Sequence, residues 1–479
     1  MDSSKRQRYL IDCSFSLRGV MIEMDRRGQR NLFLVDNGYL KGSISDGDIR
    51  RALIAGANLD EVALYHSNQE VISVQSHLLT PATDSLFSRN ISLIPVLDEN
   101  GRVIEILEKN MISHIPISEP NLGQEELALV QNCLQSSWIS SQGSYVSEFE
   151  FVFRKYVDSL DSVTVSNGTV GLVLALKSLD IGIGDEVLVP NLTFGATANA
   201  VIQVGAIPIL VDVDYETMFI NIDEAQKKVT KKTKAVIPVY LYGKSGQIQS
   251  LLKFAQSYNL KVIEDAAEAL GTFVQGKHAG TFGDIGVFSF FANKTITTGE
   301  GGMLVFASSS LADRARKMRS HGFHPDKKYW HDEWGSNFRL TNIQAAIGVG
   351  QMGKIKNFVR KKREIASAYS EMLMPLQKRN ILVTRDPSNP SDSFWLSTVQ
   401  LTESKSIQPL QDFLSKSAIE TRRFFYPLNI QPAFRGFASK DDFPVSLKLF
   451  NSGLCLPSST KLSYSQIEFV CRCLLDFFK

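Results

Sequence analysis

Residues 163–213 read VTVSNGTVGLVLALKSLDIGIGDEVLVPNLTFGATANAVIQVGAIPILVDV, and short apolar runs alternate here with helical patterns. The same alternation continues to residue 264. Strands that alternate with helices are typical of a mostly parallel sheet covered by helices, so we predict an α/β fold. The predicted strands are Val163–Val165, Glu186–Val189, Ile207–Val213, Ala235–Tyr240 and Lys261–Glu264, and the predicted helices are Thr169–Ser178, Ala196–Val204, Asp223–Val229 and Gln249–Ser257.

The length of the chain, 479 residues, corresponds to about three domains of ordinary size. Prolines and a glycine in residues 113–123 indicate a linker, and a helical pattern begins directly after it. A long helical pattern at Phe358–Leu373 leads into mixed segments. We therefore predict an N-terminal module over 1–112, a linker over 113–123, a large domain over 124–360 and a small α+β domain over 361–479.

The composition argues against several classes of partner. Lys and Arg number 52 and Asp and Glu 50, which disfavours a broad basic face for nucleic acid. The five cysteines form no C-x-x-C pair, and no His/Cys spacing is typical of zinc. We find neither a signal peptide nor an apolar stretch of membrane-spanning length. We therefore expect a cytoplasmic protein with no metal, no membrane contact and no nucleic acid.

Three short motifs carry groups that could act together. Ser166–Thr169 lies between a strand and a helix, where backbone N–H groups can hold a phosphate. Asp265 lies at the end of an apolar strand, and Lys294 lies in the apolar, Thr- and Gly-rich run 287–302, VFSFFANKTITTGEGG. Taken singly, these motifs also fit a turn, a helix cap and a surface lysine. Together, a lysine, an acid and a phosphate cradle are the protein parts of a pyridoxal phosphate site.

The order and the residues of these motifs resemble those of the DegT-type sugar-nucleotide aminotransferases, which are fold-type I enzymes dependent on pyridoxal 5′-phosphate. The resemblance implies a large domain with a mostly parallel central sheet, a small C-terminal domain, and a homodimer with shared active sites. It extends over about residues 115–479 and includes Trp138–Gly143, Glu148–Glu150, Gly184–Val187, Asn191–Phe194, Gly335–Ala346 and Gly453–Ser458.

The resemblance assigns catalytic roles to two residues. Lys294 matches the lysine that forms a Schiff base with the cofactor, and Asp265 matches the acid that pairs with the pyridine N–H. Glu268 stands where many members have Gln, near the ring hydroxyl. Some relatives carry histidine at the lysine position and are dehydratases, so Lys294 favours transamination.

Five further residues match cofactor-binding positions. Gly168, Thr169 and Ser289 match residues that hold the phosphate, and Phe194 matches an aromatic that stacks on the ring. Asn337 matches a residue that reaches the phosphate of the neighbouring subunit's cofactor.

Within this family, the runs Phe290–Gly302, Tyr329–Gly335 and Ile419–Pro427 resemble perosamine synthases, which aminate C4 of a GDP-4-keto-6-deoxy-mannose. The resemblance implies a nucleotide-linked keto sugar as acceptor, glutamate as amino donor, and a role in surface polysaccharide (O-antigen) biosynthesis. Two alternatives stay open. The acceptor could be a UDP- or dTDP-linked keto sugar, or the chain could be a nucleotide-sensing regulator with an inactive aminotransferase domain, which the intact lysine and acid disfavour.

The N-terminal module contains a weak internal repeat. Leu32–Gly42 and Leu93–Ile104 each read as an apolar run, a turn and a second run, which predicts two hairpins. Helical patterns lie between them at Asp46–Ala55 and Thr83–Arg89.

The run Gly42–Arg51 resembles the end of a cystathionine-β-synthase-type (CBS) repeat, which forms nucleotide-sensing modules in tandem pairs. Ser45 and Asp48 match the spacing that holds a ribose there, so the resemblance implies a regulatory nucleotide. A helix N-cap explains the same two residues. The second copy, at Ile104–Lys109, has no Ser-x-x-Asp, so we expect one nucleotide site at most. The module could instead be an assembly surface.

Overall fold

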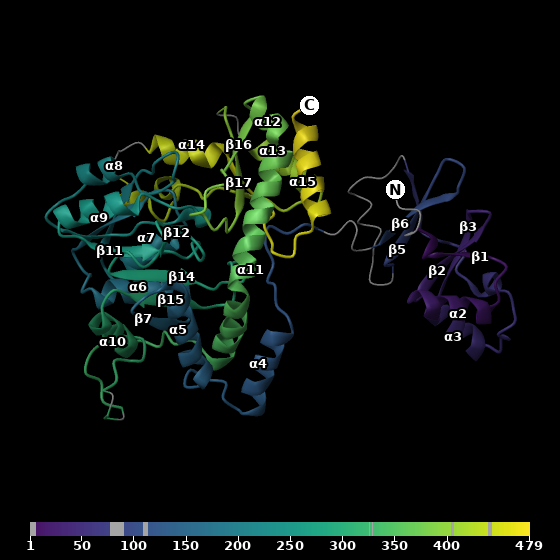
Figure 1. Ribbon diagram of the computed structural model, residues 1–479, viewed down its shortest axis with the longest axis horizontal. Helices are drawn as coiled ribbons and strands as arrows, with labels where there is room; N and C mark the ends of the chain where they lie inside the picture. The colour runs from purple at the N-terminus through teal and green to yellow at the C-terminus, as the bar shows by residue number, and fades with distance from the viewer. Residues whose placement is uncertain are drawn as a thin grey trace. The chain divides into compact units, whose positions relative to one another are not determined.

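The computed structural model describes residues 6–76, 91–108, 114–324, 326–327, 329–403, 407–438 and 443–479. The chain divides into two compact units, residues 1–114 with 416–418, and residues 115–415 with 419–479 (Figure 1). The helix predicted at Thr83–Arg89 lies outside the described residues.

A central sheet organises the larger unit, and the described part of it has seven strands in the order β7-β15-β14-β11-β10-β8-β9. All described neighbours in this sheet pair in parallel except those of β15, which runs against β14 and β7. The prediction of a mostly parallel sheet is therefore confirmed. The strands are β7 (Asp161–Val165), β8 (Glu186–Pro190), β9 (Ile207–Val211), β10 (Thr233–Val236), β11 (Lys261–Asp265), β14 (Ile285–Ser289) and β15 (Gly302–Phe306).

Helices cover both faces of this sheet because its strands alternate their apolar side chains between two cores. Leu304 of β15 packs in one core, and its neighbours Met303 and Val305 pack in the other. One face is covered by α6 (Gly168–Ser178), α7 (Ala196–Gln203) and α10 (Ser309–Met318). The other is covered by α5 (Ser144–Val157), α9 (Ile248–Ser257) and α11 (Asn342–Met372).

Helix α11 begins well before the predicted Phe358, and the boundary predicted at residue 360 falls inside it. Three glycines at 348, 350 and 353 obscured its first turns in the sequence. Packing explains why one of these positions is glycine, since a Cβ on Gly348 would lie 2.6 Å from the ring of Phe149 on α5.

A smaller sheet in the order β16-β17-β19-β18 packs against the second half of α11 (Figure 1). Its strands are β16 (Leu382–Thr384), β17 (Ser397–Leu401), β18 (Arg422–Arg423) and β19 (Gly453–Leu456). The remaining α-helices and strands described in this unit are α4 (Gln124–Gln135), α8 (Ile222–Lys227), α12 (Met374–Lys378), α13 (Gln408–Lys416), α14 (Pro444–Ser452), α15 (Tyr464–Phe477) and the hairpin β12 (Phe273–Val274) with β13 (Lys277–His278). No helix in the described ranges is long and apolar enough to cross a membrane.

The N-terminal unit contains the two predicted hairpins, β2/β3 and β5/β6. Each hairpin belongs to a three-stranded sheet whose remaining strand is parallel to the first hairpin strand. The sheets share apolar contacts, because Phe33 of β2 packs with Leu97 and Val103. The elements are β1 (Leu10–Asp12), α2 (Leu17–Arg27), β2 (Asn31–Asp36), β3 (Tyr39–Ser45), α3 (Asp46–Ile54), β4 (Val74–Gln75), β5 (Leu93–Leu97) and β6 (Val103–Glu108).

Helix α11 carries a buried lysine in the larger unit. Lys362 is 2% exposed, and its Nζ donates to the carbonyl oxygens of Trp395 at 2.8 Å and Ser458 at 2.9 Å. Burial lowers the pKa of Lys362 from 10.5 to about 7. The unfolded chain therefore binds more protons than the folded chain between these two values, and stability rises with pH across this window.

Replacing Lys362 by Met should flatten the pH dependence of stability. Relative to the variant, the unmodified protein should gain up to about 1.4 kcal/mol of unfolding free energy per pH unit between pH 7 and pH 9. Urea unfolding at pH 7, 8 and 9 measures this slope, and Lys356→Met, on the exposed face of the same helix, is the control. Equal slopes in the Lys362→Met variant and the unmodified protein would contradict the assignment.

Candidate active site

The predicted site residues of the larger unit follow the carboxyl ends of parallel strands. Gly168 follows β7, Phe194 follows β8, and Asp265 and Ser289 are the last residues of β11 and β14. Because these strands are parallel, their carboxyl ends meet at one edge of the sheet, where open α/β folds bind ligands.

Asp265 is a buried carboxylate held by two donors. Its Oδ2 accepts a hydrogen bond from the hydroxyl of Thr197 at 2.8 Å, and its Oδ1 accepts one from the N–H of Ala267 at 3.2 Å. Burial raises the pKa of Asp265, and the bond from Thr197 opposes this rise. Among the described residues Asp265 has no ion-pair partner within 4.0 Å. A ligand that brings a positive N–H to this carboxylate would therefore be strongly favoured.

Lys294 pairs with Glu268 beside this carboxylate. The Nζ of Lys294 lies 3.4 Å from Oε1 of Glu268, and the two side chains are 13% and 6% exposed. The other carboxylate oxygen of Glu268 accepts the N–H of Tyr242 at 2.8 Å. Burial raises the pKa of Glu268, and the charge of Lys294 opposes this rise. The lysine is thus enclosed, with two carboxyl groups near its amine.

The start of α6 forms the predicted anion cradle. The side chain of Asn167 caps the helix by accepting the N–H of Val170 at 3.0 Å, and the first N–H groups of a helix have no acceptor within the helix. A Cβ on Gly168 would lie only 3.0 Å from Cβ of Ser289. The glycine therefore lets the hydroxyl of Ser289 approach the helix N-terminus, where an anion is favoured.

Phe194 lines a cavity of about 520 Å³ beside this cradle, and its ring is 62% exposed. Thr169 also lines it, as do the aromatic side chains of Phe425, Tyr426 and Phe434. The sequence alone does not identify these three aromatics as site residues, although Phe425 and Tyr426 belong to the run Ile419–Pro427. Thr197 was also missed, since a threonine within a helix carries no sign of a partner 68 residues away.

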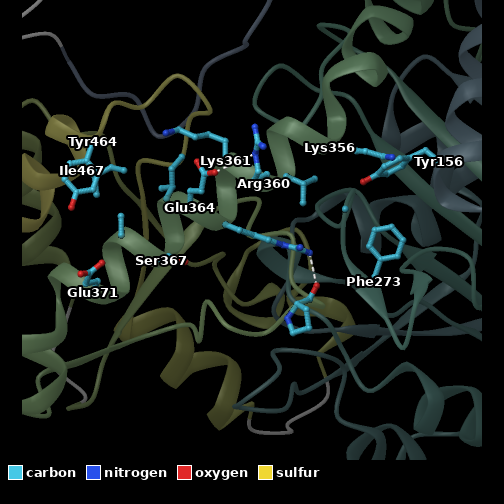
Figure 2. A pocket seen from close by; sticks show the side chains of 16 residues that line it. Tyr156, Phe273, Lys356, Arg360, Lys361, Glu364, Ser367, Glu371, Tyr464 and Ile467 are labelled. Carbon is cyan, nitrogen blue, oxygen red and sulfur yellow. Dashed lines mark hydrogen bonds and ion pairs between the residues drawn. The ribbon is translucent and has the colours of Figure 1, made fainter.

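A larger hollow of about 810 Å³ lies along α11 and is lined by none of the predicted cofactor-binding residues (Figure 2). Figure 2 shows Lys356 beside Tyr156 and, at the other end, Ser367 and Glu371. Its basic side chains are spread along the helix and do not surround one point, so we place the candidate site at the sheet edge.

The structure does not bring Asn337 into this cluster. Its side chain is exposed and accepts a hydrogen bond from Nε of Arg339 at 3.0 Å. The next residue lies close to the cradle, because the carbonyl of Phe338 accepts the N–H of Ser166 at 2.9 Å. The predicted role of Asn337 requires a second subunit and stays a prediction.

Ser45 and Asp48, in the N-terminal unit, form reciprocal hydrogen bonds at the start of α3. The hydroxyl of Ser45 accepts the N–H of Asp48 at 3.2 Å, and Oδ2 of Asp48 accepts the N–H of Ser45 at 2.8 Å. The second carboxylate oxygen of Asp48 pairs with Arg51 at 2.6 Å. This is a capping box, so the structure gives both residues a local role, and nucleotide binding stays a prediction.

Comparison with known proteins covers the larger unit. Residues 120–475 match the model of the DegT/DnrJ/EryC1/StrS aminotransferase family. The chain is similar to the GDP-perosamine synthases of Vibrio cholerae, at 39% identity over 76% of this chain and 99% of that protein, and of Escherichia coli O157:H7, at 40% identity over 77% and 99%.

Among solved structures, the aminotransferase TlmJ of Streptoalloteichus hindustanus is 30% identical over 76% of this chain and all of that chain, with a TM-score of 0.71. The family match begins at residue 120, so it gives no support to a CBS-type pair in the N-terminal unit. In the larger unit, the family match, the mostly parallel sheet and the enclosed lysine all indicate the same kind of enzyme. The chain belongs to the DegT/DnrJ/EryC1/StrS aminotransferase family and is a pyridoxal-phosphate-dependent sugar aminotransferase.

Proposed function

We propose that this enzyme transfers the amino group of glutamate to the 4-keto group of a GDP-linked 4-keto-6-deoxy sugar, in the synthesis of a surface polysaccharide. The observation that carries the reaction type is the enclosed Lys294 beside the buried Asp265. The choice of sugar is supported by 39% and 40% identity to two GDP-perosamine synthases.

The residues at the sheet edge fit pyridoxal phosphate. Gly168 leaves room for an anion between the start of α6 and Ser289. Asp265 offers a buried carboxylate that has no ion-pair partner within 4.0 Å among the described residues, and the cofactor has a basic ring nitrogen. When bound, the cofactor supplies an electron-accepting ring that stabilises negative charge on a carbon next to the amino group.

Asp265 would keep a proton on the ring nitrogen of the cofactor. Its burial makes the bare carboxylate costly, so a proton shared with that nitrogen is favoured over water. Thr197 orients the carboxylate through its hydrogen bond to Oδ2.

Lys294 holds the cofactor and moves the proton of the reaction. Its Nζ would be the general base that removes the proton from Cα of the amino donor, and then the acid that returns it. The same groups act in the reverse order on the keto sugar. Phe194 would pack against the cofactor ring, and Glu268 would lie near its hydroxyl group.

We also propose that the enzyme is a homodimer with shared active sites. Exposed apolar side chains on and after α4 support this, because such a patch on a soluble chain indicates an interface. They are Leu127, Leu134, Trp138 and Ile139. Asn337 would then reach the phosphate in the partner subunit.

An acceptor panel tests the proposed reaction. With glutamate as donor, the GDP-linked 4-keto-6-deoxy sugar should be aminated at least tenfold faster than its UDP- and dTDP-linked counterparts, as measured by mass spectrometry of the products. Lys294→Ala should lose turnover by a factor of at least 10³, since both the attachment and the proton carrier are removed. Lys356→Ala is the matched control.

Faster amination of a UDP- or dTDP-linked sugar would show that the acceptor is not GDP-linked. Transamination retained in Lys294→Ala would overturn the role of the lysine. A chain that binds the cofactor but aminates none of the sugars would favour the regulatory alternative.

Gly168→Ala should weaken cofactor binding about tenfold, because the new methyl group would crowd Ser289 at the phosphate position. A spectroscopic titration with pyridoxal phosphate measures the Kd. Gly353→Ala, whose Cβ would meet nothing within 4 Å, is the control. An unchanged Kd for Gly168→Ala would place the phosphate elsewhere.

For the N-terminal unit we propose a regulatory nucleotide site at Ser45 and Asp48, supported by the two matching sheets. Adenine, guanine and cytosine nucleotides should be tested for a thermal shift of the full chain. Ser45→Ala with Asp48→Ala should abolish any shift, whereas Ser16→Ala, which removes a different N-cap of the same unit, should not. No shift with any nucleotide would favour an assembly surface.

A further inference from the structure

The amine of Lys294 has a second close neighbour that contributes no carboxylate. Its Nζ lies 4.0 Å from the centroid of the Trp395 indole. Trp395 is 3% exposed and lies two residues before the start of β17 of the small sheet, about 100 residues from the lysine in sequence. A cation over the face of tryptophan is attracted by the ring, and more strongly when both are shielded from water.

Three contacts hold Trp395 in place. Its indole N–H donates to the carbonyl of Asn293 at 2.8 Å, directly before Lys294. Its own carbonyl accepts the ammonium of Lys362 at 2.8 Å. Its ring is stacked on Tyr242, with centroids 6.4 Å apart and planes at 10°. The indole is thus held by the lysine loop and by Tyr242 of the large domain, and the backbone of Trp395 is held by α11.

Glu268 contacts the same amine at 3.4 Å, and it is fixed as well. The N–H that holds its other oxygen comes from Tyr242, whose φ of 54° is uncommon for a residue other than glycine. The same tyrosine therefore orients Glu268 through its backbone and supports Trp395 through its ring.

Other charged groups also face this amine. Asp265 interacts with it electrostatically. Glu119 and Lys362 line a cavity of about 10 Å³ together with Lys294. None of these groups forms an ion pair with Lys294 within 4.0 Å. Among the described residues, that ion pair is made by Glu268.

We propose that Trp395 and Glu268 form a seat for the ammonium of Lys294, with Trp395 as a positioning residue. The seat holds the protonated amine inside the site whenever the lysine is not bonded to the cofactor. Its use in catalysis rests on the proposed function, because only there does Lys294 carry a proton between two substrates. The seat itself consists of contacts among this chain's own residues.

The test measures the amine directly in the full-length, cofactor-free protein. Lys294 is acetylated with an N-hydroxysuccinimide ester between pH 6 and pH 10, and the rate is read by peptide mass spectrometry. Only the neutral amine reacts, so the midpoint of the pH–rate profile reports how strongly the ammonium is stabilised. The plateau at high pH reports access of the reagent. Exposed Lys356 in the same sample is the internal reference.

Glu268→Gln should move the midpoint down by about one pH unit, so the rate at pH 7.5 rises about tenfold while the plateau is unchanged. Trp395→Leu should move it the same way, with a rate increase of about threefold at pH 7.5, whereas Trp395→Phe keeps an aromatic face and should change it less. Glu300→Gln, an exposed carboxylate, is the control and should change nothing.

If neither Glu268→Gln nor Trp395→Leu moves the midpoint of the pH–rate profile, the proposed seat for the ammonium is wrong. A higher plateau with an unmoved midpoint in Trp395→Leu would show that Trp395 only shields the amine, and would overturn its part. Neither result depends on a sugar or on turnover, so a failure of the proposed reaction is recognised separately.

Discussion

The buried carboxylate of Asp265 at the end of β11 is the constraint around which the rest of the site is arranged. An ionised carboxylate out of water costs several kcal/mol unless a charge or strong donors compensate it. Thr197 and the N–H of Ala267 supply two hydrogen bonds, and among the described residues no cation within 4.0 Å completes the compensation. A cofactor with a protonated ring nitrogen would complete the compensation of this charge. The buried carboxylate, which is costly for folding, therefore favours binding of such a ligand.

The lysine is positioned by both parts of the larger unit. Its loop connects β14 with the antiparallel β15, and such a short connection permits no crossover helix. Glu268 and Tyr242 belong to the large domain, whereas Trp395 comes from the small sheet. Helix α11 joins the two parts, because its first half packs in the core of the large sheet and its second half in the core of the small one. Movement of the small sheet relative to α11 would therefore change the surroundings of the amine.

The sequence predicted those site residues that lie next to strand ends. Gly168 and Asp265 were found because they lie next to the ends of predicted strands, and these strands differ from the observed ones by a few residues. Ser289 and Lys294 were found from the run 287–302 and its resemblance to the family, because no strand was predicted there. Strands β14 and β15 were both missed, and the antiparallel direction of β15 depends on its pairing with β14 and β7. Trp395 and Thr197 were missed because only folding brings them to the site. The spacing of Ser45 and Asp48 is ambiguous, since one pair of residues serves a capping box and a ribose equally well.

The central claim is that Lys294 is the residue that bonds to the cofactor, and the chain contains a plausible rival. Lys362 is buried, and its pKa of about 7 makes a neutral amine readily available. Reducing the holoenzyme with borohydride fixes the cofactor to whichever lysine holds it, and peptide mass spectrometry identifies that residue. The account predicts a pyridoxyl group on the peptide containing Lys294 alone; a pyridoxyl group on Lys362, or on any other lysine in its place, would contradict it.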